Sequence, residues 1–285
     1  MIEDVQPAPN GFPTLFIPYD RLIDIAAQHG RSRQTVETVI RGFTVFPDDL
    51  VAENRIVFRP KQESRAYRRG FFLFPHATGP HLAFSKAMAQ EGVIQLGTSV
   101  CYQRLPREWV TPATEAGLSE LSNAAGRWFE RIVTENLASL GFIGRRAKYA
   151  VGSASSSIPI PPTVGELDFL GFHPGERTLV LLEAKMVRSG LEAAFWRNDI
   201  ADFLRGDQSH SAKFRRKVAW VGEHRTEIAA VLGAPNPVHF RFALITLYPC
   251  IASEMISDYP CVSLTEFVLD YRHAGRWPYV TANES

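Results

Sequence analysis

The chain has 285 residues, 45% of them apolar, and its 31 basic and 30 acidic residues leave a formal net charge of +1. This length and apolar content suffice for a sizeable buried core in one or two domains. The near-zero charge excludes a uniformly basic protein, so any nucleic-acid-binding surface has to be local. Three cysteines without metal-binding spacing predict reduced thiols in a cytoplasmic protein, and no apolar run approaches the roughly 20 residues that span a bilayer.

Two helices are predicted near the N-terminus, over about residues 20–41. Apolar residues recur there at helical spacing, Gly30 can end the first helix, and Ser32 can cap the second. The pattern A-A-x-x-G-x-S-x-x-T-V resembles the helix-turn-helix of bacterial DNA-binding proteins. Arg31 departs from that pattern, because an apolar residue usually follows the glycine.

The helix-turn-helix resemblance implies a DNA-facing start of the second helix, with Val36 and Val39 packing inward. The residues that would face DNA are Arg33, Gln34 and Thr35. An ordinary helical hairpin is the alternative interpretation of the same pattern.

Residues 42–107 carry a weaker pattern. Short β-like segments occur, including the one at residues 55–58, and the pattern predicts a helix over 81–90 and a strand over 93–102. A proline-containing linker around 106–112 separates this part from the remainder of the chain. The sequence therefore predicts an N-terminal DNA-binding or sensing domain over 1–108 and a second domain over 109–285.

The second domain opens with a strongly periodic helix over 118–140, which a strand with basic residues follows. Residues 153–163 (S-A-S-S-S-I-P-I-P-P-T) predict a polar loop broken by prolines. After the segment over 165–187, helices are predicted over 191–204 and from 205 on. A buried strand over 238–247, a short strand at 261–262 and a final helix complete the domain.

The central feature of the chain is the segment over 165–187, G-E-L-D-F-L-G-F-H-P-G-E-R-T-L-V-L-L-E-A-K-M-V. It predicts two apolar β-strands joined by a tight turn. Because side chains alternate along a strand, Glu166 and Asp168 share one face, while Leu167 and Phe169 share the other.

The turn length decides which residues of the two strands face each other. A four-residue loop, Pro174–Arg177, places Asp168 opposite Glu183 and Glu166 opposite Lys185. A two-residue Pro-Gly loop is the competing register, although an L-proline fits the favoured hairpin turns poorly. Either register gathers three carboxylates and one ammonium on one face. Apposed carboxylates repel unless a cation lies between them, and a hard divalent ion is the natural occupant.

The chain carries Asp168 and, after fourteen intervening residues, the motif Glu183-Ala184-Lys185. This pattern resembles the motif of the PD-(D/E)xK nuclease superfamily, which includes restriction endonucleases and junction resolvases. The chain departs from the family pattern at Leu167, where a proline often stands. The resemblance implies that Asp168 and Glu183 bind Mg²⁺, for which Mn²⁺ would substitute, and that Lys185 orients or activates the attacking water. The backbone carbonyl of Ala184 is a further candidate ligand. An exposed hairpin with solvated charges is the alternative, but it does not explain charges beside the apolar run L-V-L-L.

Enzymes of this superfamily commonly carry a carboxylate on the helix that precedes the hairpin. Glu130 lies beside the apolar stripe of the helix over 118–140 and is the candidate for that role, with Glu135 as the alternative. Glu130 or Glu166 would support a second ion.

A basic helix follows the E-x-K strand in many of these nucleases and contacts the DNA backbone. The corresponding residues here are Lys213, Arg215, Arg216 and Lys217. A solvated helix face is the alternative.

The resemblance implies an α/β fold, with a restriction-endonuclease-like αβββαβ core over about 110–270 preceded by a smaller α+β domain with the helix-turn-helix. It also implies a Mg²⁺-dependent endonuclease that hydrolyses phosphodiester bonds in DNA, in restriction or defence. Restriction-like enzymes often pair to cut both strands, so a homodimer is a candidate assembly. The alternatives are a non-catalytic DNA-binding regulator with a decayed nuclease fold and an RNA-cleaving effector.

Overall fold

The computed structural model describes residues 14–48, 69–102, 105–153, 156–187, 193–234 and 239–279. The chain is a mixed α/β protein that divides into two compact units, residues 1–123 and 124–285. The division falls within the long helix α5 (Pro112–Ser139). The domain boundary predicted after residue 108 stays a prediction, since α5 carries the chain from one unit into the other. Within the described residues, no helix is both long and apolar enough to cross a bilayer.

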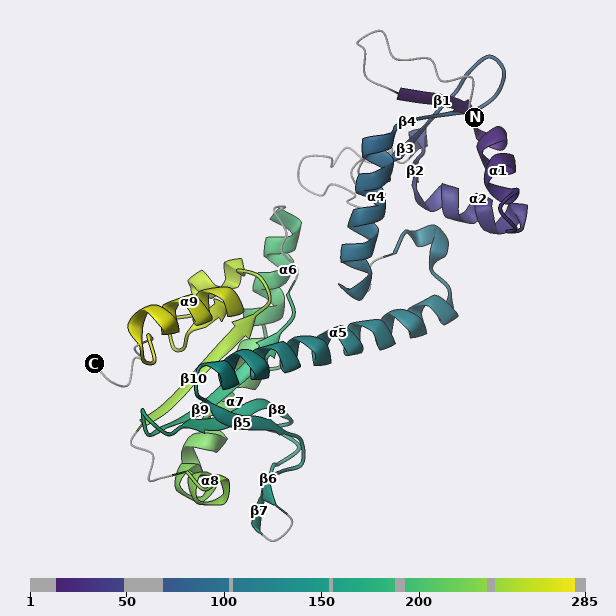
Figure 1. The fold of residues 1–285 in the computed structure, drawn as a ribbon. Helices are drawn as coiled ribbons and strands as arrows, with labels where there is room; N and C mark the ends of the chain where they lie inside the picture. The colour runs from purple at the N-terminus through teal and green to yellow at the C-terminus, as the bar shows by residue number, and fades with distance from the viewer. Residues whose placement is uncertain are drawn as a thin grey trace. The chain divides into compact units, whose positions relative to one another are not determined.

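The first unit contains a four-stranded sheet with the order β1-β4-β3-β2 (Figure 1). Its elements are β1 (Thr14–Pro18), α1 (Tyr19–Ala27), α2 (Arg33–Gly42), β2 (Thr44–Val45), β3 (Phe71–Phe74), β4 (His81–Ser85) and α4 (Lys86–Ser99), followed by 3₁₀ helices at Val100–Tyr102 and Arg107–Trp109.

The helical pair predicted over about 20–41 is confirmed as α1 and α2. Gly30 adopts a φ of 87° in the turn, and the Ser32 side chain accepts a hydrogen bond from the Thr35 N–H at 3.1 Å. Val36 is buried as predicted, but Val39 is 44% exposed, so its predicted inward packing is wrong. Val36 and Ile40, one turn apart, face the core instead.

The predictions for 81–102 are wrong in two places. His81–Ser85 forms a strand because it pairs with β1 on one side and β3 on the other. The helix begins only at Lys86, where the Ser85 hydroxyl accepts from the Met88 N–H at 3.1 Å. It continues to Ser99, and a 3₁₀ helix follows at Val100–Tyr102, so the predicted strand at 93–102 is helical. The β-like segment at 55–58 lies outside the described residues.

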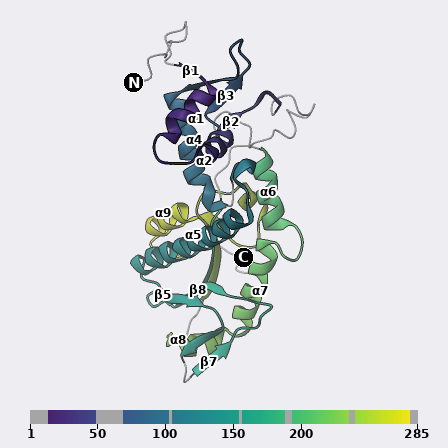
Figure 2. The ribbon, with the colours of Figure 1, turned by 90° about the vertical axis from the view of Figure 1, so that its right-hand side faces the viewer.

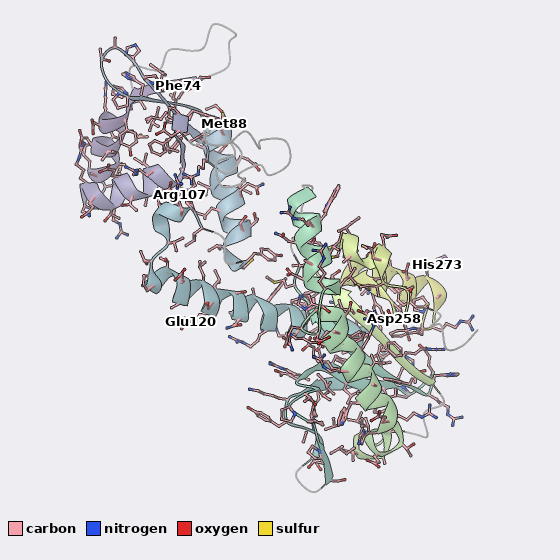
Figure 3. All side chains as sticks on the ribbon, turned by 180° about the vertical axis from the view of Figure 1, so that it is seen from behind. Phe74, Met88, Arg107, Glu120, Asp258 and His273 are labelled. Atoms are coloured by element: carbon pink, nitrogen blue, oxygen red, sulfur yellow. The ribbon has the colours of Figure 1, made fainter. Side chains whose placement is uncertain are left out.

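The predicted linker around 106–112 is held against the first unit. The buried guanidinium of Arg69 donates to both carboxylate oxygens of Glu108, at 3.0 and 3.1 Å. The neighbouring Trp109 indole donates to the Thr38 carbonyl at 2.8 Å. Arg107, labelled in Figure 3, begins the 3₁₀ helix that carries Glu108 and Trp109.

The second unit contains a five-stranded sheet with the order β11-β10-β9-β8-β5. β5, β8 and β9 are antiparallel neighbours, whereas β9, β10 and β11 run parallel. The elements are β5 (Ile143–Ala147), β6 (Ala150–Ser153), β7 (Ser156–Pro159), β8 (Leu167–His173), β9 (Thr178–Lys185), α6 (Ala193–Leu204), α7 (His210–Glu223), α8 (Arg225–Leu232), β10 (His239–Thr246), β11 (Cys261–Ser263) and α9 (Leu264–Ala274).

Most of the second unit agrees with the sequence-based prediction. The central hairpin, the strand at 239–246, the short strand at 261–263 and the final helix are confirmed. The loop predicted over 153–163 is wrong in part, because β7 pairs with β6 as a small antiparallel hairpin.

Helices cover both faces of the five-stranded sheet. One face carries α5 and α9, which Figure 2 shows beside each other, and their apolar side chains pack on Phe169, Val180 and Leu182. The other face carries α6, α7 and α8, which pack on Leu170, Leu179 and Leu181. Within each strand, successive side chains pack on opposite faces of the sheet, as expected for a strand that is buried on both sides.

The hairpin has the four-residue loop Pro174–Arg177, so the predicted register is confirmed. His173 pairs with Thr178, and the pairing continues to Phe169 and Leu182. The predicted pairs Asp168–Glu183 and Glu166–Lys185 lie beyond these paired residues and stay predictions.

The pairing of β5 with β8 shifts between Arg145 and Ala147. This β-bulge separates Leu167 from Phe169, which pack in different apolar clusters, so the prediction that they share a face is wrong. A bulge changes the direction of neighbouring side chains, and this one lies beside Asp168.

Candidate active site

Two carboxylates lie side by side at the centre of the second unit. Asp168 on β8 is 8% exposed and Glu183 on β9 is 2% exposed, because helices cover both faces of these strands. The Asp168 Oδ2 accepts a hydrogen bond from the Ala184 N–H at 2.9 Å. This bond ties the aspartate to the strand that carries the glutamate.

Each oxygen of Glu183 is bonded to a lysine. Lys185 Nζ lies 2.7 Å from Glu183 Oε1, and Lys217 Nζ lies 2.5 Å from Oε2. Lys185 is also 3.9 Å from Asp168 Oδ2. We call Asp168, Glu183, Lys185 and Lys217 the inner cluster.

The position of Lys217 differs from the one predicted from the sequence. The sequence predicts that it contacts the DNA backbone from the outer face of its helix, but its side chain is 8% exposed and its ammonium is bonded within the inner cluster. The apolar residues Phe214 and Val221, one turn before and after it, define the inward face of α7. Because Lys217 falls between Phe214 and Val221 at helical spacing, it lies on the buried side of α7. A buried ammonium there requires a carboxylate from the neighbouring sheet as its partner.

Burial and neighbouring charges affect the two carboxylates differently. Burial, and then the charge of Glu183, raise the pKa of Asp168 to about 7. Burial would also raise the pKa of Glu183, but Lys185 and Lys217 together hold it below its usual range. Burial opposes the charge of Lys185, yet Glu183 and Asp168 raise its pKa overall. The inner cluster therefore contains a charged glutamate, a charged lysine and an aspartate that titrates near neutrality.

The raised pKa of Asp168 predicts an unusual pH dependence for the metal-free protein. Between the ordinary aspartate pKa of about 4 and the folded value of about 7, the folded protein binds a proton that the unfolded chain has lost. Stability in chelator should therefore fall as the pH rises through this window. Thermal unfolding at a series of pH values measures the fall, and Asp168→Asn should flatten it. A wild-type curve as flat as that of Asp168→Asn would contradict the assignment.

A second group of charges lies beside the first. Arg146 on β5 lies 3.4 Å from Glu130 of α5 through its Nη1 and is bonded to Glu166 through its Nε. Burial raises the pKa of Glu130, with Arg146 acting against that shift. We call Glu130, Arg146 and Glu166 the outer cluster. Glu135, the alternative to Glu130, is 61% exposed and lies 3.7 Å from Arg131 on its own helix.

Asp168 and Glu183 are the buried carboxylates of the described residues that could hold one Mg²⁺ ion. Magnesium is ordinarily held by one or two carboxylates, with waters and substrate phosphates as its other ligands. Both carboxylates offer hard oxygens. Burial, and then the charge of Glu183, raise the pKa of Asp168, and a nearby cation would favour its charged form. Glu166 is directed to Arg146, and no group of three or more His, Cys, Asp or Glu side chains within the described ranges could hold a metal. The Ala184 carbonyl as a ligand stays a prediction.

His210 at the start of α7 also lies near the inner cluster. Burial, and then the charge of Lys185, lower the pKa of this histidine to about 4, so its imidazole is neutral at neutral pH. Its ring meets that of Phe203 edge-on, with centroids 4.9 Å apart.

Two of the other basic residues predicted to contact DNA from α7 are held within their own unit. Arg215 forms a two-bond ion pair with Asp258, labelled in Figure 3, at 2.6 and 3.1 Å. Arg216 donates to the carbonyls of Thr163 and Asp207 at 3.3 and 3.0 Å. Lys213 is half-buried. DNA contact by these residues stays a prediction.

The residues predicted to face DNA from the start of α2 have similar internal partners. Arg33 pairs with Asp20 at 2.5 Å and also bonds Asp24, so it ties α2 to α1. The Thr35 hydroxyl lies 2.8 Å from that of Ser32, while Gln34 is exposed. Contact of these residues with DNA stays a prediction.

Searches against protein-family models, curated proteins and solved structures found no match for this chain.

Proposed function

We propose that this chain is a Mg²⁺-dependent endonuclease of the PD-(D/E)xK type that acts on DNA. The single observation that carries the proposal is the buried pair of Asp168 and Glu183, with Lys185 two residues further along the same strand. The order α5, β5, β8, β9, helices and β10 in the five-stranded sheet supports the proposal, because it resembles the αβββαβ order of that superfamily when the separate β6–β7 hairpin is set aside. The helix-turn-helix would then select the target or hold the enzyme on the duplex, in a restriction or defence role.

Asp168 and Glu183 would hold the ion, which would polarise the phosphodiester, acidify a bound water and stabilise the charge of the transition state. Lys185 would donate a hydrogen bond to the attacking water and orient it. Because its pKa is raised, Lys185 remains an ammonium and has no lone pair with which to accept the proton. Lys217 would keep Glu183 charged and fixed in position.

The test is incubation of the full chain with supercoiled plasmid in the presence of Mg²⁺ or of chelator. Wild type should nick or linearise the plasmid only with Mg²⁺. Asp168→Asn should not, although its amide oxygen can still accept the Ala184 N–H. A parallel RNA substrate separates DNA cleavage from RNA cleavage. Metal-independent cleavage, or full activity of Asp168→Asn, would reject the proposed chemistry.

One observation favours a second candidate, a DNA-binding regulator that no longer cleaves. Both Glu183 oxygens are already bonded to ammonium groups, so the inner cluster is neutralised by its own side chains. In that case the plasmid would be bound and shifted on a gel at low salt, with no cleavage at any Mg²⁺ concentration.

A further inference from the structure

Arg146 holds two carboxylates that come from different elements. Its guanidinium bonds Glu166, just before β8, and approaches Glu130 of α5 to 3.4 Å. The arginine side chain is 42% exposed, whereas Glu130 and Glu166 are 22% and 26% exposed. Arg146 is therefore the most exposed member of the outer cluster.

Charges of the inner cluster affect the pKa values of residues in the outer cluster. The charge of Asp168 helps to raise the pKa of Arg146, after the Glu166 bond and the Glu130 charge. Lys185 and Glu183 likewise act on Glu130. Without Arg146, the carboxylates Glu130, Glu166 and Asp168 would lie on this side of the site with one cation fewer. Among the described residues, Lys185 acts on Glu130 and Asp168, and Lys217 acts on Asp168. Such an arrangement is unfavourable unless a cation is present.

The local fold keeps Arg146 in this place. The residue lies at the register shift between β5 and β8, so its position is set by the bulge that also adjoins Asp168. An arginine suits the position because different nitrogens of its planar group can bond two carboxylates at once. It also retains its charge at any accessible pH.

We propose that Arg146 occupies a second cation position of the site. The chain then takes one divalent ion, at Asp168 and Glu183, while the guanidinium fills the place between Glu130 and Glu166. Removing the guanidinium should open that place to a second divalent ion. This inference rests on the proposed function only in assigning the first ion to the inner cluster.

The test counts bound Mn²⁺ on the metal-stripped full chain, by the electron paramagnetic resonance signal of the free ion. Arg146→Met should bind one more ion than wild type. Arg146→Lys, which keeps a cation, should bind the same number as wild type. The double variant Arg146→Met with Glu166→Gln should lose the additional ion.

An unchanged ion count in folded Arg146→Met, verified by circular dichroism, would overturn the proposal. If that variant does not fold, the variant Glu130→Gln with Glu166→Gln decides the question. Its ion count should equal that of wild type, and a lower count would show that wild type already holds an ion there. A wild type that binds one Mn²⁺ but leaves DNA intact would end the nuclease assignment and leave this inference standing.

Discussion

Lys185→Ala is expected to lower DNA cleavage by about 10²- to 10³-fold, the effect of removing one preorganised donor from a transition state. Lys185 is the member of the inner cluster that reaches solvent, since its side chain is 25% exposed and that of Lys217 is 8% exposed. It is therefore the ammonium that can meet a bound phosphate and water. Initial rates of plasmid nicking at saturating Mg²⁺ measure the loss.

The same substitution should leave the fold intact. Glu183 keeps its 2.5 Å bond to Lys217 when Lys185 is removed, so no buried carboxylate loses all its partners. The melting temperature in chelator should therefore stay close to that of wild type. The matched control is Lys148→Ala, which removes an exposed lysine whose ammonium lies over the Tyr149 ring. Cleavage by Lys185→Ala at the rate of Lys148→Ala would exclude the assigned role.

The hairpin could be predicted because its determinants are local. The turn residues set the register of the hairpin from His173 and Thr178 to Phe169 and Leu182, and Asp168 and Glu183 directly follow that last pair. The strand His81–Ser85 could not be predicted, for the opposite reason. Its neighbours β1 and β3 decide its conformation, and the pairing with β1 joins segments far apart in sequence. Helical periodicity within the segment carries no information about that pairing.

The charges around the site were only partly predictable. The acidic residues could be identified because they interrupt apolar strands. Lys217 carried a usable signal, since residues 214, 217 and 221 define one inward helix face, but its basic neighbours suggested an exposed patch. Arg146 carried no such signal. Its contacts depend on the register shift between β5 and β8, which does not follow from local pattern.

Glu183→Gln is expected to lower the free energy of unfolding by about 3–5 kcal/mol. This is the usual cost of removing one partner of a buried ion pair while the other stays charged. The Lys217 ammonium is buried, and Glu183 is the partner to which the described structure bonds it, at 2.5 Å. A neutral amide leaves that charge desolvated and uncompensated. Urea unfolding in chelator measures the change.

Adding Lys217→Met to Glu183→Gln should recover most of the lost stability, because the methionine removes the uncompensated charge and its length suits the apolar surroundings of Phe214 and Val221. Lys217→Met alone should cost less than Glu183→Gln, since Lys185 still bonds Glu183 at 2.7 Å. The four proteins form a double-mutant cycle, and its coupling free energy isolates the pair. Additive losses in the double variant would show that the two side chains stabilise the protein independently. Strong coupling would show that the buried lysine and the buried carboxylate stabilise each other, and that an apolar pair can replace them in the fold.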